Sequence, residues 1–395
     1  MNNRKSGSVS TGSIGIIGRF ILVTVTALAV CMPLGTLQAD SLWTPFLNLS
    51  AIHDDNILFS RTDAQDDYIY AIEPGLQYDY SREVTHFHSR GSAYIRRYQD
   101  NDDLNDEIYN FELNGDSNLT ERFSLRGNYE FIKDTTLDSE LLETGRIFVR
   151  QDRINHRAGL GTKYYLNERM SLGLQGGYRD VAYESNSNDY SVWNVNLPLR
   201  WDLITQVDAV YISPGYSFRD SDTRRSKTYD LQIGWDHATT ERLKMNLSVG
   251  ARYTEHENLN NGSTDESWNG VGDLQLSYNF ETGKLILDFR HNLENTAGGD
   301  QVNVTRLVAR LRWNFTERVG MELRGRYVYA KNEGENNTDT TEYYQVGPEI
   351  FYNLTENHVI FIAYDYAQDY QKDLQVDPRA ERNRIWAGVS LNFPI

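Results

Sequence analysis

Apolar and polar residues alternate along most of the chain with a period of two. The segment 229–237 reads YDLQIGWDH, so one set of alternate positions is mostly aromatic or aliphatic and the other carries Asp, Gln and Gly. The segments 285–292 and 307–315 follow the same rule. Because successive side chains of a strand point to opposite sides of a sheet, this pattern predicts strands with one apolar and one polar face.

About eighteen segments of this kind follow one another through the chain. They lie near residues 43–53, 67–81, 86–98, 107–119, 122–133, 151–166, 170–183, 190–204, 207–220, 226–239, 242–256, 267–281, 283–295, 301–315, 319–331, 341–355, 358–370 and 382–393. They are longer than most strands of globular proteins and long enough to cross a bilayer at a tilt. An even count, eighteen or alternatively about sixteen, places both chain ends on one side.

The connections between these segments alternate in length. A short Thr/Asn-Glu-Arg turn recurs at 120–122, 167–169, 240–242 and 316–318, and longer polar stretches such as 134–150 lie between such turns. A tight polar turn between two segments of period two predicts a β-hairpin. Short turns on one side and long loops on the other are typical of outer-membrane barrels.

These patterns together predict an all-β protein, a transmembrane antiparallel up-and-down β-barrel. The barrel must be closed, because an open sheet edge leaves unpaired backbone groups that lipid does not satisfy. No long helical pattern and no second domain are visible, so residues 40–395 are expected to form a single barrel domain.

The N-terminal residues have the features of a secretory leader. Three basic residues, the last of them Arg19, precede an apolar run at 20–34, and a small residue, Ala39, ends the region. This order predicts a signal peptide at residues 1–39 that is cleaved on export. The alternative, a membrane anchor, needs ~20 apolar residues, and this run is shorter. The single cysteine, Cys31, lies inside it, so no disulfide is expected in the mature barrel.

Charge and composition narrow the function classes. The net charge of −17 argues against nucleic acid as a partner. The chain holds 26 Tyr and has a mean hydropathy of −0.60, which is polar for a soluble core but acceptable in a barrel whose alternate residues face lipid. The sequence contains no HExxH, GxSxG or P-loop motif. We therefore expect no enzymatic activity, no cofactor and no metal centre.

Several short motifs resemble one family of barrels. The opening LNLSAIHDDNILFS at 47–60, the segment IEPGLQYDYS at 72–81 and the recurring Thr-Glu-Arg turns are similar to β-barrel porins associated with exopolysaccharide biosynthesis and export in Gram-negative bacteria. The last strand, which ends at Phe393 before Pro394 and Ile395, resembles the insertion signal of outer-membrane proteins. The resemblance implies outer-membrane lipid, lipopolysaccharide and the barrel-assembly machinery as partners.

The inward polar faces carry the candidate chemistry. The turn at 316–318 predicts that Arg310 lies opposite Arg324 and that Arg326 lies opposite Val308. Like charges placed opposite each other are destabilising unless an acid or a bound anion lies between them. Acids on neighbouring strands are the structural alternative to a bound anion. The candidates for anion binding are Arg310, Arg312, Arg324, Arg326, Arg290 and Arg200.

The acidic loops offer a weaker set of candidates. Asp54, Asp55, Asp100, Asp102 and Asp103 supply the oxygen ligands that Ca²⁺ and Mg²⁺ prefer, although the spacing of a calcium loop is missing. Solvated loop tips are the alternative interpretation. For the whole chain the sequence predicts a porin-like conduit for saccharides or for exopolysaccharide export, with a non-conducting structural or assembly barrel as the alternative.

Overall fold

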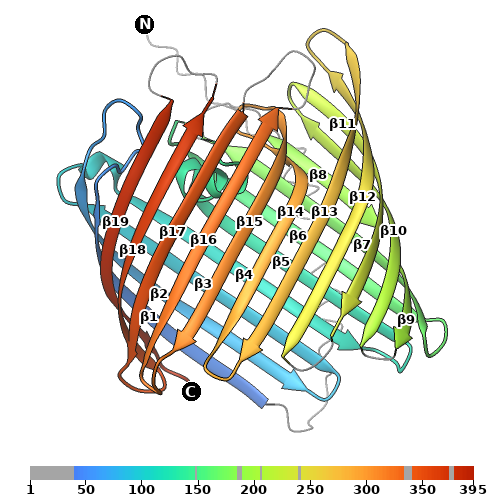
Figure 1. The fold of residues 1–395 in the computed structure, drawn as a ribbon, viewed down its shortest axis with the longest axis horizontal. Coiled ribbons are helices and arrows are strands. Elements are labelled where there is room, and N and C mark those ends of the chain that lie inside the picture. The colour runs from blue at the N-terminus through green and yellow to red at the C-terminus, as the bar shows by residue number, and fades with distance from the viewer. Residues whose placement is uncertain are drawn as a thin grey trace, which may run out of the picture.

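The computed structural model describes residues 40–146, 149–184, 189–204, 207–238, 242–332, 340–372 and 378–395. These residues form one antiparallel sheet that closes on itself (Figure 1). Strand β1 (Asp40–Asp54) pairs with β2 (Asp67–Arg82) on one side and with β19 (Arg379–Asn392) on the other. The predicted closure of the barrel is confirmed.

The remaining strands pair with their neighbours in sequence, as an up-and-down barrel requires. They are β3 (Thr85–Tyr98), β4 (Asp106–Asn118), β5 (Phe123–Thr135), β6 (Asp152–Tyr165), β7 (Met170–Tyr183), β8 (Tyr190–Asn196), β9 (Leu199–Ile204), β10 (Asp208–Ser221), β11 (Arg224–His237), β12 (Leu243–Asn258), β13 (Thr264–Phe280), β14 (Gly283–Asn295), β15 (Gln301–Asn314), β16 (Val319–Asn332), β17 (Thr340–Asn353) and β18 (His358–Gln371).

Strands β8 and β9 share one position in the barrel. Both pair with β7 and with β10, and they lie end to end in the segment predicted as a single strand at 190–204. Pro198 stands between them, and proline interrupts a ladder because it has no backbone N–H to donate. The strands of the described residues therefore fill eighteen positions, and the predicted count is confirmed.

The outer face of the barrel is apolar. On β11 the side chains of Leu231 and Ile233 point outward, with Ile233 60% exposed, whereas Asp230 and Gln232 point inward. Trp268 of β13 is 73% exposed on the same outer surface. Such alternation suits a wall with lipid outside and polar groups inside. Among the described residues, no helix has the length and apolar character needed to cross a membrane.

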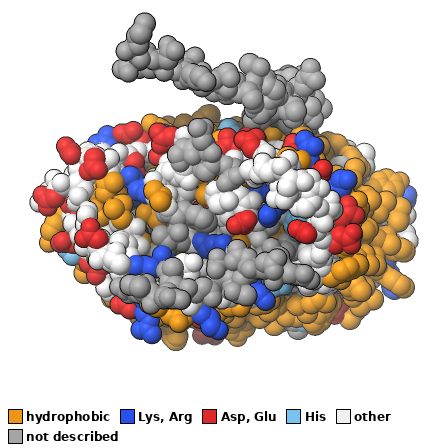
Figure 2. Space-filling model, turned by 90° about the horizontal axis from the view of Figure 1, so that it is seen from above, with side chains coloured by type: hydrophobic (Ala, Val, Ile, Leu, Met, Phe, Trp, Pro, Cys, Tyr) orange, Lys and Arg blue, Asp and Glu red, His pale blue; other side chains and the backbone are white. Residues whose placement is uncertain are grey.

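The two ends of the barrel differ as the sequence predicts. The short turns lie at the end that also holds both ends of the barrel domain, where the backbone of Trp43 pairs with that of Ile395. The longer connections lie at the opposite end, which we call the loop end. Figure 2 views this end and shows acidic side chains gathered around the rim. Residues 1–39 are outside the described residues, so the signal peptide stays a prediction.

One connection departs from the expectation of an external loop. Between β5 and β6 the chain forms a turn of π-helix, η2 (Thr136–Glu140), and a turn of α-helix, α2 (Leu141–Thr144), and both lie inside the barrel (Figure 1). Gly145 ends α2 with φ of +70°, a conformation that glycine adopts without strain. We call residues 136–146 the inward segment, and it positions the candidate site.

Candidate functional site

The inward segment reaches the opposite wall of the barrel. Leu141 is fully buried (0% exposed) in an apolar cluster with Val328 of β16 and Tyr343 of β17. Gly145 lies so close to this wall that a Cβ atom there would stand 3.1 Å from the Cγ1 of Val328. Phe59, from the β1–β2 connection, joins the cluster with its ring centroid 6.2 Å from that of Tyr343. The segment therefore crosses the lumen at the loop end.

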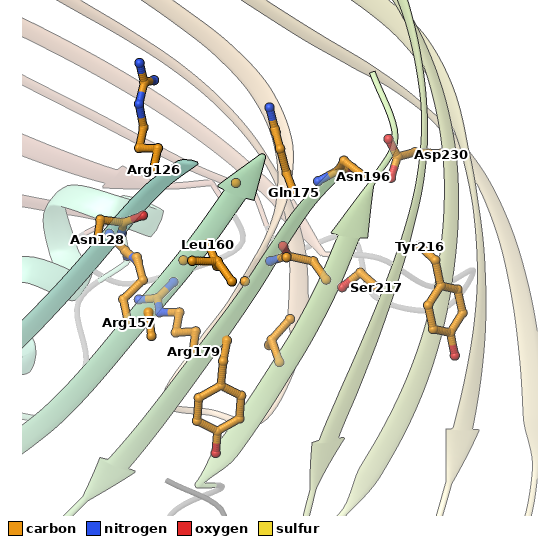
Figure 3. Close-up of a pocket in the computed structure, with 18 of the residues that line it drawn as sticks. Arg126, Asn128, Arg157, Leu160, Gln175, Arg179, Asn196, Tyr216, Ser217 and Asp230 are labelled. Atoms are coloured by element: carbon orange, nitrogen blue, oxygen red, sulfur yellow. The ribbon is translucent and has the colours of Figure 1, made fainter. Parts of the chain in front are cut away.

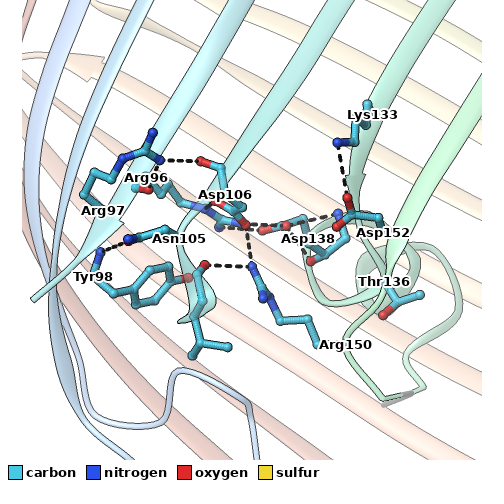
Figure 4. Close-up of polar contacts among 12 residues, drawn as sticks. Arg96, Arg97, Tyr98, Asn105, Asp106, Lys133, Thr136, Asp138, Arg150 and Asp152 are labelled. Carbon is cyan, nitrogen blue, oxygen red and sulfur yellow. Dashed lines mark hydrogen bonds and ion pairs between the residues drawn. The ribbon is translucent and has the colours of Figure 1, made fainter. Parts of the chain in front are cut away.

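Ion pairs hold the segment to the near wall (Figure 4). Both carboxylate oxygens of Asp138 accept hydrogen bonds from Arg96 of β3 at 2.8 Å. Arg96 also donates to Asp106, which accepts a further hydrogen bond from Arg150 at 2.6 Å. Burial alone would raise the pKa of Asp138, but the charge of Arg96 outweighs it and lowers that pKa. Asp138 is therefore a charged anchor.

A second carboxylate of the segment lies among three arginines. Glu143 accepts a hydrogen bond from Arg179 at 2.9 Å and lies 3.3 Å from Arg153 and 4.0 Å from Arg157. Although burial by itself raises the pKa of Glu143, the charges of Arg179, Arg153 and Arg157 outweigh it and hold the pKa at about 2. Glu143 is thus ionised at any physiological pH and binds the segment to β6 and β7.

A third carboxylate has the opposite electrostatics. Glu140 is fully buried (0% exposed) and accepts hydrogen bonds from the Tyr183 hydroxyl at 2.9 Å and the Ala297 backbone N–H at 2.5 Å. Burial raises the pKa of Glu140 to about 7, although those hydrogen bonds and the charge of Arg153 act against the rise. Glu140 links the segment to β7 and to the β14–β15 connection, and it changes charge near neutral pH.

On one side of the lumen lies a cavity of about 780 Å³, which we call the amide chamber. Its wall comes mainly from β4 to β8 and β10 to β12, and β14 and the first residue of β15 contribute the far side. Side-chain amides lie flat against inward-facing glycines of the neighbouring strand, so that a Cβ at Gly159 would stand 2.4 Å from the Asn128 amide oxygen. The pairs are Asn128 over Gly159, Asn194 over Gly177 and Asn196 over Gly215.

Charged groups also project into the amide chamber. Figure 3 shows Arg126, Arg157 and Gln175 beside Asn128 and Asn196 on adjacent strands. The side chain of Arg157 is 44% exposed, and it donates to Glu130 at 2.9 Å. The chamber therefore offers amide, guanidinium and carboxylate groups to a solute in water.

On the other side lies a cavity of about 510 Å³ between β1 to β3 and β15 to β19, which we call the aromatic cleft. Its rings are Tyr94, Phe351, Phe361 and Trp386, and its carboxylates are Glu73, Glu322 and Glu349. Phe361 lies over Gly388, where a Cβ would stand 2.7 Å from the ring. The cleft combines aromatic rings with hydrogen-bond acceptors, a mixture that suits a small ligand.

Arg310, Arg312, Arg324 and Arg326 of β15 and β16 form the predicted arginine strip, and its predicted register is confirmed. Arg310 lies opposite Arg324, and Arg326 lies opposite Val308. Glu322 lies between the first two arginines, with its Oε1 2.7 Å from Arg324 and 3.6 Å from Arg310. Glu349 of β17 binds Arg324 as well, at 2.6 Å. Acids on the same and the adjacent strand therefore balance this pair of arginines.

The other candidates differ in their partners. Arg312 lies 4.7 Å from the centre of the Phe351 ring, and Arg290 pairs with Asp273 at 2.9 Å. Arg200 pairs with Asp202 and Asp236. No ion pair of Arg326 is found among the described residues, and its Nε and Nη1 atoms are buried without a hydrogen-bond partner there. A role in anion binding stays a prediction for all six.

The acidic candidates are spread over two connections. Asp54 is buried and accepts the backbone N–H of Asn56 at 2.9 Å, and Asp55 accepts that of Asn383 at 2.6 Å. Asp100, Asp102 and Asp103 are exposed at the β3–β4 connection. The described residues contain no group of three or more His, Cys, Asp or Glu arranged to hold a metal ion. Cation binding at these aspartates stays a prediction.

Sequence reasoning missed the inward segment, although two signals were present. Thr135 and Asp138 form a capping box at the start of η2, and Leu137 and Leu141 are four residues apart, on one helical face. Both signals are short, and a polar connection of this length in a barrel is usually external. The position of the segment depends on contacts with β16 and β17, which are remote in sequence.

Comparisons with known proteins extend the description of the fold. No family model matches the sequence, and no curated protein matches it. The structure is similar to that of OpdK, an outer membrane protein from Pseudomonas aeruginosa, with a TM-score of 0.45 and 9% identity over 90% of this chain and 99% of that one. For OccK2 (OpdF) of the same organism, in complex with glucuronate, the TM-score is 0.47 and the identity is 10%, over 90% of this chain and 98% of that one. For OccAB3 of Acinetobacter baumannii the TM-score is 0.45 and the identity is 10%, over 90% of this chain and 100% of that one. These likenesses concern the barrel fold alone.

Proposed function

We propose that the protein is a porin-like conduit that lets hydrated saccharides cross the outer membrane. The observation that carries this proposal is the amide chamber, a cavity of about 780 Å³ inside a closed membrane barrel. Amides flattened against glycines offer donors and acceptors at the wall while leaving the space in front of them to the solute. Sugar hydroxyl groups exchange hydrogen bonds with water for similar ones with such a wall at small net cost.

The inward segment favours short saccharides over a threaded polymer. It divides the lumen at the loop end, so an exopolysaccharide chain needs the segment to move before it finds a continuous path. The family resemblance suggests export of exopolysaccharide. In this proposal such export requires that the inward segment first leaves its contacts with the opposite wall.

A second function is favoured by a different observation. Leu141 and Phe59 are fully buried against β16 and β17, and Glu140 is fully buried against β7 and the β14–β15 connection, so the segment is well packed at both walls. A barrel sealed in this way would serve as a non-conducting structural or assembly component of the envelope.

Reconstitution separates the two functions. The purified protein in a planar bilayer is expected to carry a steady ionic current, and liposomes that contain it are expected to swell faster in a monosaccharide than in a long oligosaccharide. A wild-type barrel that gives neither current nor swelling would overturn the conduit and support the sealed barrel. Empty liposomes and liposomes with heat-denatured protein are the controls.

A further inference from the structure

Three arginines meet where the aromatic cleft ends below the inward segment. Arg326 comes from β16, and Arg382 and Arg384 come from β19. Tyr343 of β17 lies among them, and all three guanidinium groups are close enough to act electrostatically on its phenol. We call these three residues the arginine cluster. Although Arg326 and Arg382 are 56 positions apart in the sequence, only two strands, β17 and β18, lie between their strands in the barrel.

The cluster has more hydrogen-bond donors than acceptors. The Nε of Arg382, the Nε of Arg384 and the hydroxyl of Tyr343 are buried without a hydrogen-bond partner among the described residues, as are two nitrogens of Arg326. Arg382 is only 6% exposed and Tyr343 is fully buried. Buried polar atoms in native proteins nearly always have partners, so a group of unpartnered donors in one place indicates a missing acceptor.

The charges of the surrounding residues are also unbalanced. Asp365 accepts a hydrogen bond from Arg384 at 2.7 Å and two from Gln345, which uses most of its acceptor capacity. Asp54 is the other carboxylate near Arg382 and Arg384. Three arginines against two carboxylates leave one positive charge, which a single carboxylate of a ligand would balance. Guanidinium forks bind carboxylates in a planar, bidentate way.

The aromatic cleft next to the cluster suits the rest of such a ligand. Arg384 lines the cleft, with its side chain 31% exposed, so an acid in the cleft reaches the cluster through this residue. Trp386 and Phe361 present ring faces to the apolar side of a sugar ring, while Asn48 and Glu73 are placed to meet hydroxyl groups. The cavity of about 510 Å³ has the size of small-ligand sites.

We infer that the arginine cluster and the aromatic cleft form a binding site for an acidic saccharide, whose carboxylate is held by Arg326, Arg382 and Arg384. This inference rests on the proposed conduit for its physiological meaning, but the site itself is defined by binding. It also changes the sequence-based hypothesis. Of the predicted strip, Arg326 belongs to the cluster and Arg312 lines the cleft, whereas Glu322 and Glu349 already balance Arg310 and Arg324.

Calorimetric titration of the detergent-purified full-length barrel with sodium galacturonate tests the site, with galactose as the neutral probe. The wild type is expected to bind galacturonate at least about tenfold more tightly than galactose, as the loss of a charge-assisted hydrogen bond would predict. Arg326→Gln is expected to remove that preference. Arg290→Gln is the control, because this arginine pairs with Asp273 and neither residue lines the cleft.

The outcomes separate the site from the conduit. Equal binding of galacturonate and galactose by the wild type, or an unchanged galacturonate affinity in Arg326→Gln, would overturn the site even if the barrel conducts. Inorganic phosphate that binds as tightly as galacturonate would overturn the acidic sugar and leave only an oxyanion site. A barrel that binds galacturonate but carries no current would overturn the conduit and keep the site. Heat-modifiable migration in electrophoresis checks that each variant is folded.

Discussion

The amide chamber and the aromatic cleft occupy the same barrel but differ in the chemistry of their inward faces. The chamber presents amides over glycines, and two of its arginines, Arg157 and Arg179, pair with acids. The cleft presents aromatic rings, and the arginine cluster at its end keeps donors without acceptors among the described residues. The inward segment contacts opposite walls of the barrel, with Leu141 against β16 and β17 and Glu143 against β6 and β7.

The difference shows how one pattern of alternation supports two kinds of site. The outer positions of every strand must be apolar because they face lipid, whereas the inner positions are restrained only by space and charge balance. Each half of the barrel is thus free to adopt its own inward chemistry without any change in the fold. The inward segment then determines whether the two halves act separately or as one passage.

Removal of the segment is expected to have the largest effect. Replacing residues 137–144 by a short Gly-Ser linker takes away the contacts with Val328 and Tyr343 and opens the lumen at the loop end. Single-channel conductance is expected to rise several-fold, because the narrowest part of the path widens. Replacement of residues 259–263, an exposed turn between β12 and β13, is the control and should leave the conductance unchanged. An unaltered current after removal of 137–144 would show that the segment does not divide the lumen.

Loss of one anchor comes next. Glu143→Gln removes the charge that Arg153, Arg157 and Arg179 share, and Arg153 is almost completely buried. Breaking a buried ion pair on one side typically costs about 4 kcal/mol, so the docked segment should become protease-sensitive and the current noisy. Limited proteolysis followed by mass spectrometry locates the cut. Glu130→Gln, which removes an exposed partner of Arg157, is the matched control with a much smaller effect. Equal protection of Glu143→Gln and the wild type would contradict the anchor.

A pH effect of somewhat smaller size follows from Glu140. Burial raises its pKa from an ordinary 4.5 to about 7 in the docked segment. The docked form therefore binds a proton more tightly than the released form, so docking is strongest below pH 4.5 and weakens as the pH rises through 7. The full change corresponds to about 3 kcal/mol.

Channel recordings from pH 5 to 8 measure this effect. Opening events are expected to become more frequent as the pH rises in the wild type, and Glu140→Gln is expected to remove that dependence because glutamine does not ionise. Glu143 provides an internal comparison, since a carboxyl with a pKa of about 2 does not titrate in this range. A wild-type profile that is flat, or one that slopes the other way, would show that Glu140 does not control docking.

The smallest effects are expected from single wall residues. Asn128→Ala in the amide chamber and Trp386→Ala in the aromatic cleft each remove one surface while leaving the inward segment in place. Loss of one neutral hydrogen bond is worth about 1 kcal/mol, so Asn128→Ala should shorten the residence of a neutral saccharide less than tenfold. Trp386→Ala should act chiefly on galacturonate. Saccharide-induced current noise, recorded with a neutral saccharide and with galacturonate, compares the two variants. If both variants respond identically to both sugars, the two cavities do not differ in the sugar that they bind.

Much of the barrel is readable from the sequence. The strand positions, the order of short and long connections and the pairing of Arg310 with Arg324 all follow from local alternation and from turns that join neighbouring strands. Glu322, which balances that pair, was also visible, because its position on β16 follows from the same turn. The sequence did not show that Glu349 lies beside Arg324, because that position depends on the register of the next hairpin. The predicted anion binding at the strip therefore left this acid out.

The sequence by itself therefore determined the wall of this protein: an antiparallel barrel of eighteen positions with an apolar exterior, because each strand pairs with its neighbour and lipid imposes one rule on every outward side chain. Only the tertiary structure decided what fills the lumen. Leu141 packs with Tyr343 across 202 positions, and Arg326 and Arg382, which are 56 positions apart, both act on the phenol of that tyrosine. No local pattern relates these residues, because their proximity depends on the docked inward segment and on the wall that β16 to β19 form together.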